Sequence, residues 1–218
     1  MTAPHPIKID FVSDIVCPWC AIGLASLETA LQRLDGVVQA EVQVQPFQLN
    51  PDMAPEGEDI IEHLARKYGM TAEQVRSNQA AIRQRGAEVG FAFSLEGRSR
   101  TWNTFDAHRL VHWASLQGQA LALKHALLTA YFTEGRNVAD HSVLLDKVAA
   151  VGLDVAAARA VLDSDAHAAA VRERLDFYRG QGIGSVPSII INDRHLIQGG
   201  QPPEVFEQAL RKLATAAD

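Results

Sequence analysis

The two cysteines of this 218-residue chain, Cys17 and Cys20, are its only cysteines, and they enclose the dipeptide Pro18-Trp19. They stand between a strand-like run, Ile7–Asp14, and a helix-like run, Ala21–Leu34. A C-x-x-C pair at a junction from strand to helix is typical of a dithiol–disulfide redox centre. This pattern constrains the fold more than any other feature of the sequence, because it requires a helix that begins at a thiol.

That position suits thiol chemistry because the thiolate is the nucleophile in disulfide exchange, and the first turn of a helix favours an anion. We expect Cys17 to be the nucleophile and Cys20, one helical turn later, to attack the resulting mixed disulfide. Pro18 fits an early helical position, which needs no backbone donor. Trp19 is expected on the surface, where its flat apolar ring can meet a peptide substrate.

Two other interpretations of the cysteine pair are weaker. Structural zinc usually takes four ligands, yet the chain has no second cysteine pair. A structural disulfide that closes so short a loop would constrain the unfolded chain very little. We therefore favour redox chemistry and expect no metal site and no tightly bound cofactor.

The composition is that of an ordinary globular protein, with 47% apolar residues, 21% charged residues and a formal net charge of −6. An acidic balance gives no basic surface for nucleic acid or for an anionic membrane. No run approaches the roughly 20 apolar residues of a membrane span, and the first residues lack the apolar segment of a secretory signal. We therefore expect a cytoplasmic protein, in a compartment where disulfides are usually transient and catalytic.

The first part of the chain predicts a strand, a helix and a second strand. Ile7, Ile9 and Phe11 alternate with polar residues, a helix is expected over Cys17–Leu34, and alternation returns at Val42–Phe47. This order is the βαβ unit of a parallel sheet. With a C-x-x-C at its first strand–helix turn, the unit predicts a thioredoxin-like fold.

Only helical signals follow between the turn-forming segment Pro51–Gly57 and Gly182. Thr71 and Gln74 predict a capping box at the start of one of these helices. The predicted helices are a stripe at Ile60–Tyr68, then 71–89, Phe105–Leu116, Gln119–Phe132, Ser142–Val151, Val155–Leu162 and Asp165–Gln181. We therefore expect a helical insertion over residues 53–182.

Strand signals return at the end of the chain. Ser188–Ile191 and His195–Ile197 flank a turn and predict a hairpin, and Pro203-Glu204 begins a last helix in the favoured way. Together the two ends predict an α/β thioredoxin fold (βαβ…ββα). Residues 1–52 and 183–218 would form this discontinuous domain, and the helical insertion of residues 53–182 would interrupt it.

Pro187 directly precedes the predicted strand Ser188–Ile191, where a missing backbone donor is tolerated. Given the predicted fold, we expect a cis Val186–Pro187 bond, although cis is only about 5–6% of X–Pro bonds in folded proteins. The alternative is an ordinary trans proline at a strand edge. In the cis arrangement the backbone of Val186 would face Cys17 and pair with an extended substrate peptide.

The chain resembles the DsbA branch of the thioredoxin superfamily, and within it the FrnE-like group of disulfide oxidoreductases. Four stretches carry the resemblance: Ser13–Cys20, Asn103–Leu110, Phe132–Asn137 and Gly182–Ser188. The resemblance implies a thioredoxin fold with a helical insertion, a redox-active Cys17–Cys20 pair and a cis-Pro187. Some members carry an extra cysteine pair near the C-terminus, which this chain lacks.

Three further residues are candidates near the thiols. Asp14 lies three residues before Cys17, and a helix-capping or solvated acid is a more common role for such a residue than proton acceptance during exchange. By resemblance, Asn103 and His108 line the substrate cleft near Cys17, where a histidine can tune a thiolate or carry a proton.

The leading functional hypothesis is a thiol–disulfide oxidoreductase that oxidises, reduces or isomerises protein disulfides, with glutathione as a candidate redox partner. A second is a glutathione-dependent isomerase or transferase of the kappa or 2-hydroxychromene-2-carboxylate isomerase type. Those proteins generally carry serine where Cys17 stands and lack the second cysteine. A third is a redox-sensing partner protein without enzymatic turnover. The sequence is compatible with a monomer or a homodimer.

Overall fold

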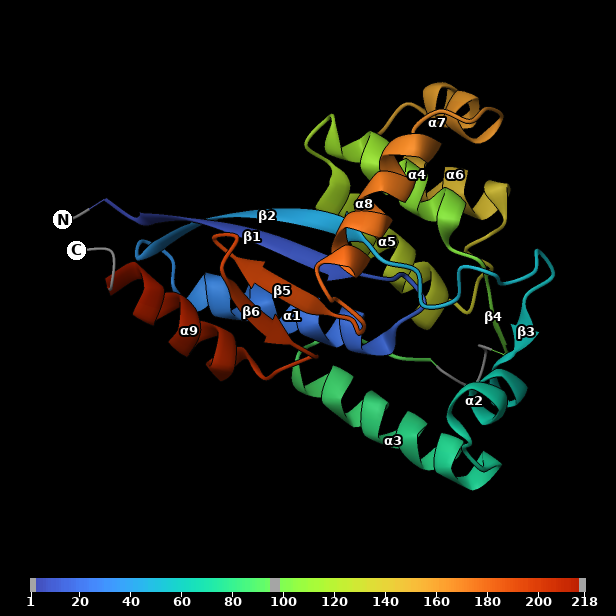
Figure 1. The fold of residues 1–218 in the computed structure, drawn as a ribbon, viewed down its shortest axis with the longest axis horizontal. Helices are drawn as coiled ribbons and strands as arrows, with labels where there is room; N and C mark the ends of the chain where they lie inside the picture. The colour runs from blue at the N-terminus through green and yellow to red at the C-terminus, as the bar shows by residue number, and fades with distance from the viewer. Residues whose placement is uncertain (1–2, 95–98, 216–218) are drawn as a thin grey trace.

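The computed structural model describes residues 3–94 and 99–215, and Figure 1 shows the arrangement of its elements. Strands β1, β2, β5 and β6 form one sheet, and helices surround it. The elements in chain order are β1 (His5–Ser13), α1 (Pro18–Arg33), β2 (Val38–Pro46), β3 (Glu58–Asp59), α2 (Ile60–Tyr68), α3 (Ala72–Glu88), β4 (Arg100–Thr101), α4 (Phe105–Ser115), α5 (Ala120–Phe132), α6 (His141–Ala150), α7 (Val155–Leu162), α8 (Ala168–Gly180), β5 (Ser188–Ile191), β6 (His195–Gln198) and α9 (Pro203–Thr215).

The sheet has the strand order β2-β1-β5-β6. β2 is parallel to β1, as a strand–helix–strand unit requires, and Phe11 of β1 pairs with Val44. β5 is antiparallel to β1, with Phe11 opposite Ile189, and β6 closes a hairpin with β5. The predicted thioredoxin fold, βαβ followed by ββα, is therefore confirmed.

The two faces of β1 pack into different layers. Ile7, Ile9 and Phe11 point into the main core with α1 and α9, while Val12 points to the other face and packs with Tyr178 of α8. This follows from the period of two in a strand. Burying each such apolar side chain contributes about 1.5–3 kcal/mol, so Phe11→Ala is expected to destabilise the fold by about 3–5 kcal/mol.

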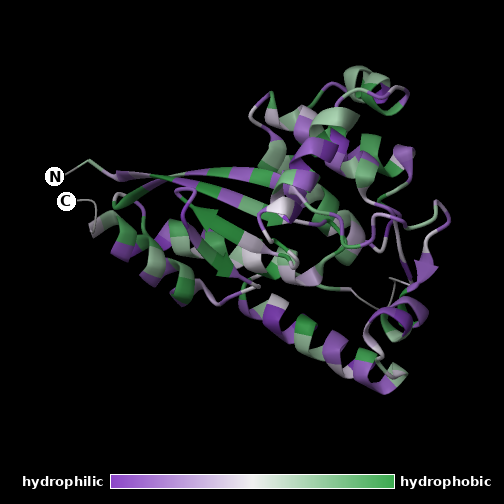
Figure 2. Ribbon diagram, in the orientation of Figure 1, coloured by the Kyte–Doolittle hydropathy of each residue, from purple (hydrophilic) through white to green (hydrophobic). Residues whose placement is uncertain are grey.

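The hydrophobic residues are concentrated where the elements pack against one another. Figure 2 shows β5 as largely hydrophobic, in agreement with its position inside the sheet, where Ile189 and Ile191 are fully buried. Most of α3 is hydrophilic in the same view, and its buried residues include Val75 and Ile82, which lie seven residues apart on one side. α3 therefore packs through a narrow stripe and leaves most of its surface exposed.

The insertion between β2 and β5 is mainly helical, as predicted, and it supplies α2 to α8. It also contains two short strands that the sequence did not reveal: Glu58–Asp59 of β3 pairs with Arg100–Thr101 of β4. Two-residue strands are too short to show a hydrophobic period. The predicted capping box is present, since Thr71 and Gln74 bond to each other's backbone at the start of α3.

The domain limits 1–52, 53–182 and 183–218 stay a prediction. Among the described helices, none combines the length and the apolar character needed to cross a membrane. No cluster of three or more metal-ligating side chains of the His, Cys, Asp and Glu types occurs within residues 3–94 and 99–215.

Candidate active site

Helix α1 begins directly after Cys17, which is its N-cap residue and has an extended backbone conformation, with φ −96° and ψ 114°. Pro18 is the first helical residue, where its missing N–H costs nothing. Both cysteines are free thiols and both are buried, Cys17 with 4% exposure and Cys20 with none. Trp19 is 39% exposed, as predicted for a surface residue beside the thiols. Cys17 therefore stands at the N-terminus of α1, where the helix dipole favours an anion.

The Val186–Pro187 peptide bond is cis, as the sequence predicted. The Sγ of Cys17 donates to the carbonyl oxygen of Val186 at 3.5 Å, so the backbone of Val186 faces the thiol. Gly23 of α1 permits this approach, because a Cβ at that position would lie 2.9 Å from Cγ of Pro187. The two segments of the chain, 169 residues apart, thus meet at Cys17.

A cleft of about 520 Å³ opens over Cys17. The thioredoxin part of the chain forms one wall of this cleft, and α2 and α3 form the other. Its lining residues include Val16, Cys17, Pro18, Trp19, Ile60, Leu64, Tyr68, Met70, Val75, Ile82, Ser185 and Val186. Most of these side chains are apolar, so the surface next to the thiol suits an extended apolar segment of a substrate.

Lys67 is a cationic side chain in this cleft. Its Nζ donates to the carbonyl oxygen of Leu49 at 2.7 Å and to Oδ1 of Asn50 at 2.6 Å. Partial burial lowers the pKa of Lys67, and the nearby charges of Asp14 and Cys17 oppose that effect. Sequence pattern does not single out this residue, because lysines are common on amphipathic surface helices.

Asp14 lies beneath the thiols and is fully buried. Its carboxylate accepts from the N–H of Ile15 at 2.7 Å and from the N–H of Leu49 at 2.8 Å, and it lies 3.2 Å from Nε2 of His108. The favoured interpretation of Asp14 as a helix-capping or solvated acid is therefore wrong. Burial opposes ionisation, but these donors hold the pKa of Asp14 below its usual value.

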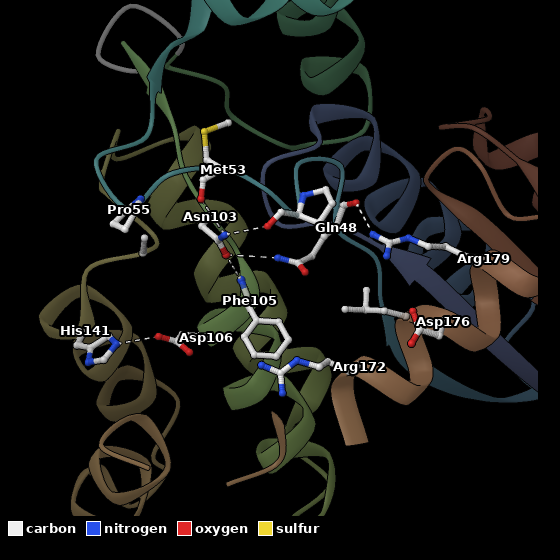
Figure 3. Close-up of a pocket in the computed structure, with 13 residues that line it drawn as sticks. Gln48, Met53, Pro55, Asn103, Phe105, Asp106, His141, Arg172, Asp176 and Arg179 are labelled. Carbon is white, nitrogen blue, oxygen red and sulfur yellow. Dashed lines mark hydrogen bonds and ion pairs between the residues drawn. The ribbon is translucent and has the colours of Figure 1, made fainter. Parts of the chain in front are cut away.

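His108 and Asn103 do not line the cleft over Cys17, which corrects the expectation drawn from the family resemblance. His108 is only 2% exposed, and its Nε2 contacts the carboxylate of Asp14. Burial lowers its pKa, which the carboxylate of Asp14 partly offsets. Asn103 faces a neighbouring cavity, where its Nδ2 donates to the carbonyl oxygen of Met53 at 3.1 Å and fixes the segment after β2 (Figure 3).

Lys124 of α5 was missed by the sequence reasoning. It is fully buried, and its Nζ donates to the carbonyl oxygen of Ser13 at a long 3.4 Å. Burial lowers the pKa of Lys124, and the charges of Cys20, Asp14 and Cys17 act in the opposite direction. The available signal was its helix, Ala120–Phe132, which is apolar on all sides and must therefore bury its lysine.

Cys20 is fully buried, and Lys124 lies near enough for its charge to act on this thiol. Burial first, and the hydrogen-bonded thiol of Cys17 second, raise the pKa of Cys20 well above its usual value, while the charge of Lys124 lowers it. The site therefore combines a thiol at the mouth of a cleft with a second thiol that is protonated at rest.

Comparison with known proteins supports this architecture. A solved structure of a probable DsbA oxidoreductase from Streptomyces coelicolor is 33% identical, with a TM-score of 0.88, and covers 97% of this chain and 91% of its own. The Bacillus subtilis protein YwbO, itself uncharacterized, is 27% identical over 205 residues, which are 94% of this chain and 96% of that protein.

The structure of a 2-hydroxychromene-2-carboxylate isomerase shares the fold, with a TM-score of 0.74 at 14% identity, over 96% of this chain and 97% of the other. At that identity the likeness shows the fold alone. The sequence family described as the DSBA-like thioredoxin domain matches residues 8–211, nearly the whole chain. This protein therefore belongs to the DSBA-like thioredoxin domain family.

Proposed function

We propose that this protein is a thiol–disulfide oxidoreductase of protein substrates, with Cys17 as nucleophile and Cys20 as resolving thiol. The observation that carries the proposal is the placement of Cys17. It is the N-cap of α1, lines an apolar cleft and faces the carbonyl oxygen of Val186, with Cys20 buried one turn behind it.

In the reductive direction the thiolate of Cys17 attacks one sulfur of a substrate disulfide. The substrate S–S bond breaks, a Cys17–substrate disulfide forms, and the other substrate sulfur leaves as a thiolate that takes a proton from water. The extended substrate pairs with the backbone of Val186 beside Pro187, and Pro18 and Trp19 contact its side chains.

In the second step Cys20 gives up its proton, which ends on the departing substrate thiolate, and attacks the sulfur of Cys17. The mixed disulfide breaks, the Cys17–Cys20 disulfide forms, and the second substrate sulfur leaves as a thiolate, so that one electron pair has passed to the substrate. Because burial keeps Cys20 protonated, this step needs compensation for the developing thiolate. We assign that role to the Lys124 cation, with Asp14 held in place by His108.

Either direction requires a redox partner to regenerate the pair. We propose glutathione for that role, as a thiol that reduces the Cys17–Cys20 disulfide or as a disulfide that oxidises the dithiol. Lys67 offers a cation in the cleft for a carboxylate of such a peptide. We place this chemistry in the cytoplasm, where disulfides are mostly transient and catalytic.

The test is the reduction of insulin disulfides and the oxidative refolding of a reduced protein. Cys17→Ser is expected to abolish both activities, and Cys20→Ser is expected to accumulate a mixed disulfide with the substrate. Full activity of Cys17→Ser would overturn the proposal. Substrate binding that depends on the redox state without repeated turnover would instead indicate a redox-sensing partner protein.

A glutathione-dependent isomerase or transferase is a second candidate, favoured by the fold shared with 2-hydroxychromene-2-carboxylate isomerase. That chemistry needs glutathione in the cleft but no resolving thiol. A glutathione-and-electrophile assay separates the two candidates, because activity that survives Cys20→Ser would favour the isomerase or transferase.

A further inference from the structure

A second cavity, of about 720 Å³, lies between α8 and the start of α4. Figure 3 shows its side chains, which come from the segment after β2, from α4, from the start of α6 and from one side of α8. None of the residues proposed for the exchange chemistry lines it. This cavity therefore lies outside the proposed exchange site.

This cavity and the Cys17 cleft lie on either side of a smaller hollow, along the segment that follows β2. A smaller hollow of about 350 Å³ shares Leu49 and Asn50 with the Cys17 cleft and shares Pro51 and Met53 with the second cavity. The three hollows are therefore neighbours along the segment after β2, so an extended chain bound at Cys17 has a direction in which to reach α8.

Arg172 of α8 is a cationic residue that lines the second cavity. Its guanidinium lies over the ring of Phe105, 4.8 Å from the centroid, and Figure 3 shows the two side chains together. Its guanidinium makes no hydrogen bond or ion pair with any residue in the described ranges 3–94 and 99–215. An exposed, stacked guanidinium with free donors is well suited to bind a carboxylate.

Arg179 adds a second cation on the same side of α8, seven residues later and so about 10 Å along the helix axis. Its guanidinium lies 5.8 Å from the centroid of Phe47 and donates to the carbonyl oxygen of Gln48 at 3.4 Å. That single long hydrogen bond leaves most of its donors available. The two arginines are therefore spaced for two carboxylates of one extended chain rather than for one small anion.

The acidic residues of the cavity do not cancel these charges. Asp106 is already engaged by Arg109 at 2.8 Å and by His141 at 2.9 Å. Asp176 lies between the two arginines on α8, and no ion pair joins it to either of them within the part of the chain that the structure describes. The cavity keeps an excess of positive charge, and Asp176 moderates it.

We propose that this cavity binds acidic side chains of the protein substrate whose cysteine reacts with Cys17, and so selects substrates with carboxylates near that cysteine. The inference rests on the proposed exchange function and names its substrate class. The apolar cleft accepts the residues next to the reacting cysteine, and Arg172 and Arg179 attract the more distant acidic ones. Such rim charges act mainly on association and are sensitive to salt.

The experiment compares short peptides that carry one cysteine as a chromophoric mixed disulfide with thionitrobenzoate. The peptides differ only at two positions, several residues from the cysteine, which are both Glu, both Gln or both Lys. One set of peptides carries these positions before the cysteine, and a second set carries them after it. The reduced full-length protein is mixed with each peptide under single-turnover conditions, and the rate of thionitrobenzoate release gives the second-order rate constant that corresponds to kcat/KM. We expect kcat/KM for the best Glu peptide to exceed that for its Gln counterpart about three- to tenfold at low salt, and the Lys peptide to be slowest.

Charge reversal in the protein makes the test specific. In R172E/R179E the Glu-to-Gln ratio is expected to fall to about one or below, and in D176N it is expected to rise. Arg194 is an exposed residue in the turn between β5 and β6. R194E changes the net charge by the same amount as the single variant R172E, and it is expected to leave the Glu-to-Gln ratio unchanged.

The outcomes separate this inference from the proposed function. Equal kcat/KM for Glu and Gln peptides, or an equal response to R194E and R172E, would overturn the acidic-substrate proposal while exchange itself stands. If no peptide reacts with the wild-type protein, the exchange function itself fails, and the acidic-substrate proposal falls with it.

Discussion

Nε2 of His108 lies 3.2 Å from Oδ1 of Asp14, and the two side chains are each 1% exposed. The pair joins α4 of the insertion to the end of β1, directly beneath the two thiols. It is the only contact between an acidic side chain and a histidine, lysine or arginine in residues 3–94 and 99–215 in which both side chains are almost fully buried. Removal of one partner of a buried pair leaves a buried polar group uncompensated.

The pair makes stability depend on pH. Burial lowers the pKa of His108, so on acidification the unfolded chain binds a proton there, from about pH 6.5 downward, before the folded chain does. The pKa of Asp14 is also lowered, so the unfolded carboxylate is protonated first, from about pH 4 downward. Both groups thus stabilise the fold above these pH values, and their contributions are lost as the pH falls toward the folded-state pKa values.

His108→Gln is expected to destabilise the protein at pH 7 by about 1–3 kcal/mol, because Asp14 loses its best side-chain donor. The same variant is expected to lose less stability than the wild type between pH 6.5 and pH 5. Denaturant unfolding at a series of pH values measures both effects. His195→Gln, at an exposed position, is the control, and a pH slope in His108→Gln equal to that of wild type would contradict the account.

Lys124→Met separates folding from catalysis. Replacing a buried ammonium that makes one long hydrogen bond with an apolar side chain of similar length is expected to leave stability unchanged or to raise it by about 1–3 kcal/mol. The attack of Cys20 on the mixed disulfide is expected to slow about tenfold or more, because its thiolate loses the neighbouring cation.

Rapid acid quenching and mass spectrometry follow the mixed disulfide in this variant. Leu127→Met, at another buried position of α5, is the matched control and is expected to keep the wild-type rate. Formation of the mixed disulfide should be slowed much less than its resolution. A resolution rate equal to that of wild type would remove Lys124 from the mechanism.

Gly23→Ala tests the contact between α1 and Pro187. The added methyl group would lie 2.9 Å from Cγ of Pro187 and must displace it, at a cost of about 1–3 kcal/mol, and the reaction of Cys17 with peptide disulfides is expected to slow. Gly180→Ala, where a Cβ meets no atom within 4 Å, is the control and is expected to be neutral or stabilising by up to about 1 kcal/mol. Equal behaviour of the two variants would contradict this packing.

The sequence predicted the parts of the fold and site whose signals are local. The alternation at Ile7–Phe11, the cysteine pair before α1 and the break at Pro187 each carry a pattern within a few residues, and each is confirmed by the structure. The short pairing of β3 with β4 has no such pattern. It depends on contacts between segments about 40 residues apart, which no local signal reports.

The buried charges beneath the thiols escaped prediction for a different reason. Asp14 was interpreted as a cap or a solvated acid because most acids near a helix start are so placed. Its partners, His108 and Lys124, come from α4 and α5, which reach the thiols only when the insertion packs against the sheet. The cavity with Arg172 likewise depends on how α8 meets α4.

The redox equilibrium of the Cys17–Cys20 pair tests the central claim most directly. The protein is equilibrated in glutathione buffers of graded ratio, its remaining thiols are trapped by alkylation, and intact mass counts them. We expect one two-electron transition, from two alkylated thiols to none with the loss of two hydrogens, at a potential within the roughly −270 to −120 mV range of this superfamily. Two thiols that remain alkylated at every ratio, or that oxidise independently of each other, would contradict it.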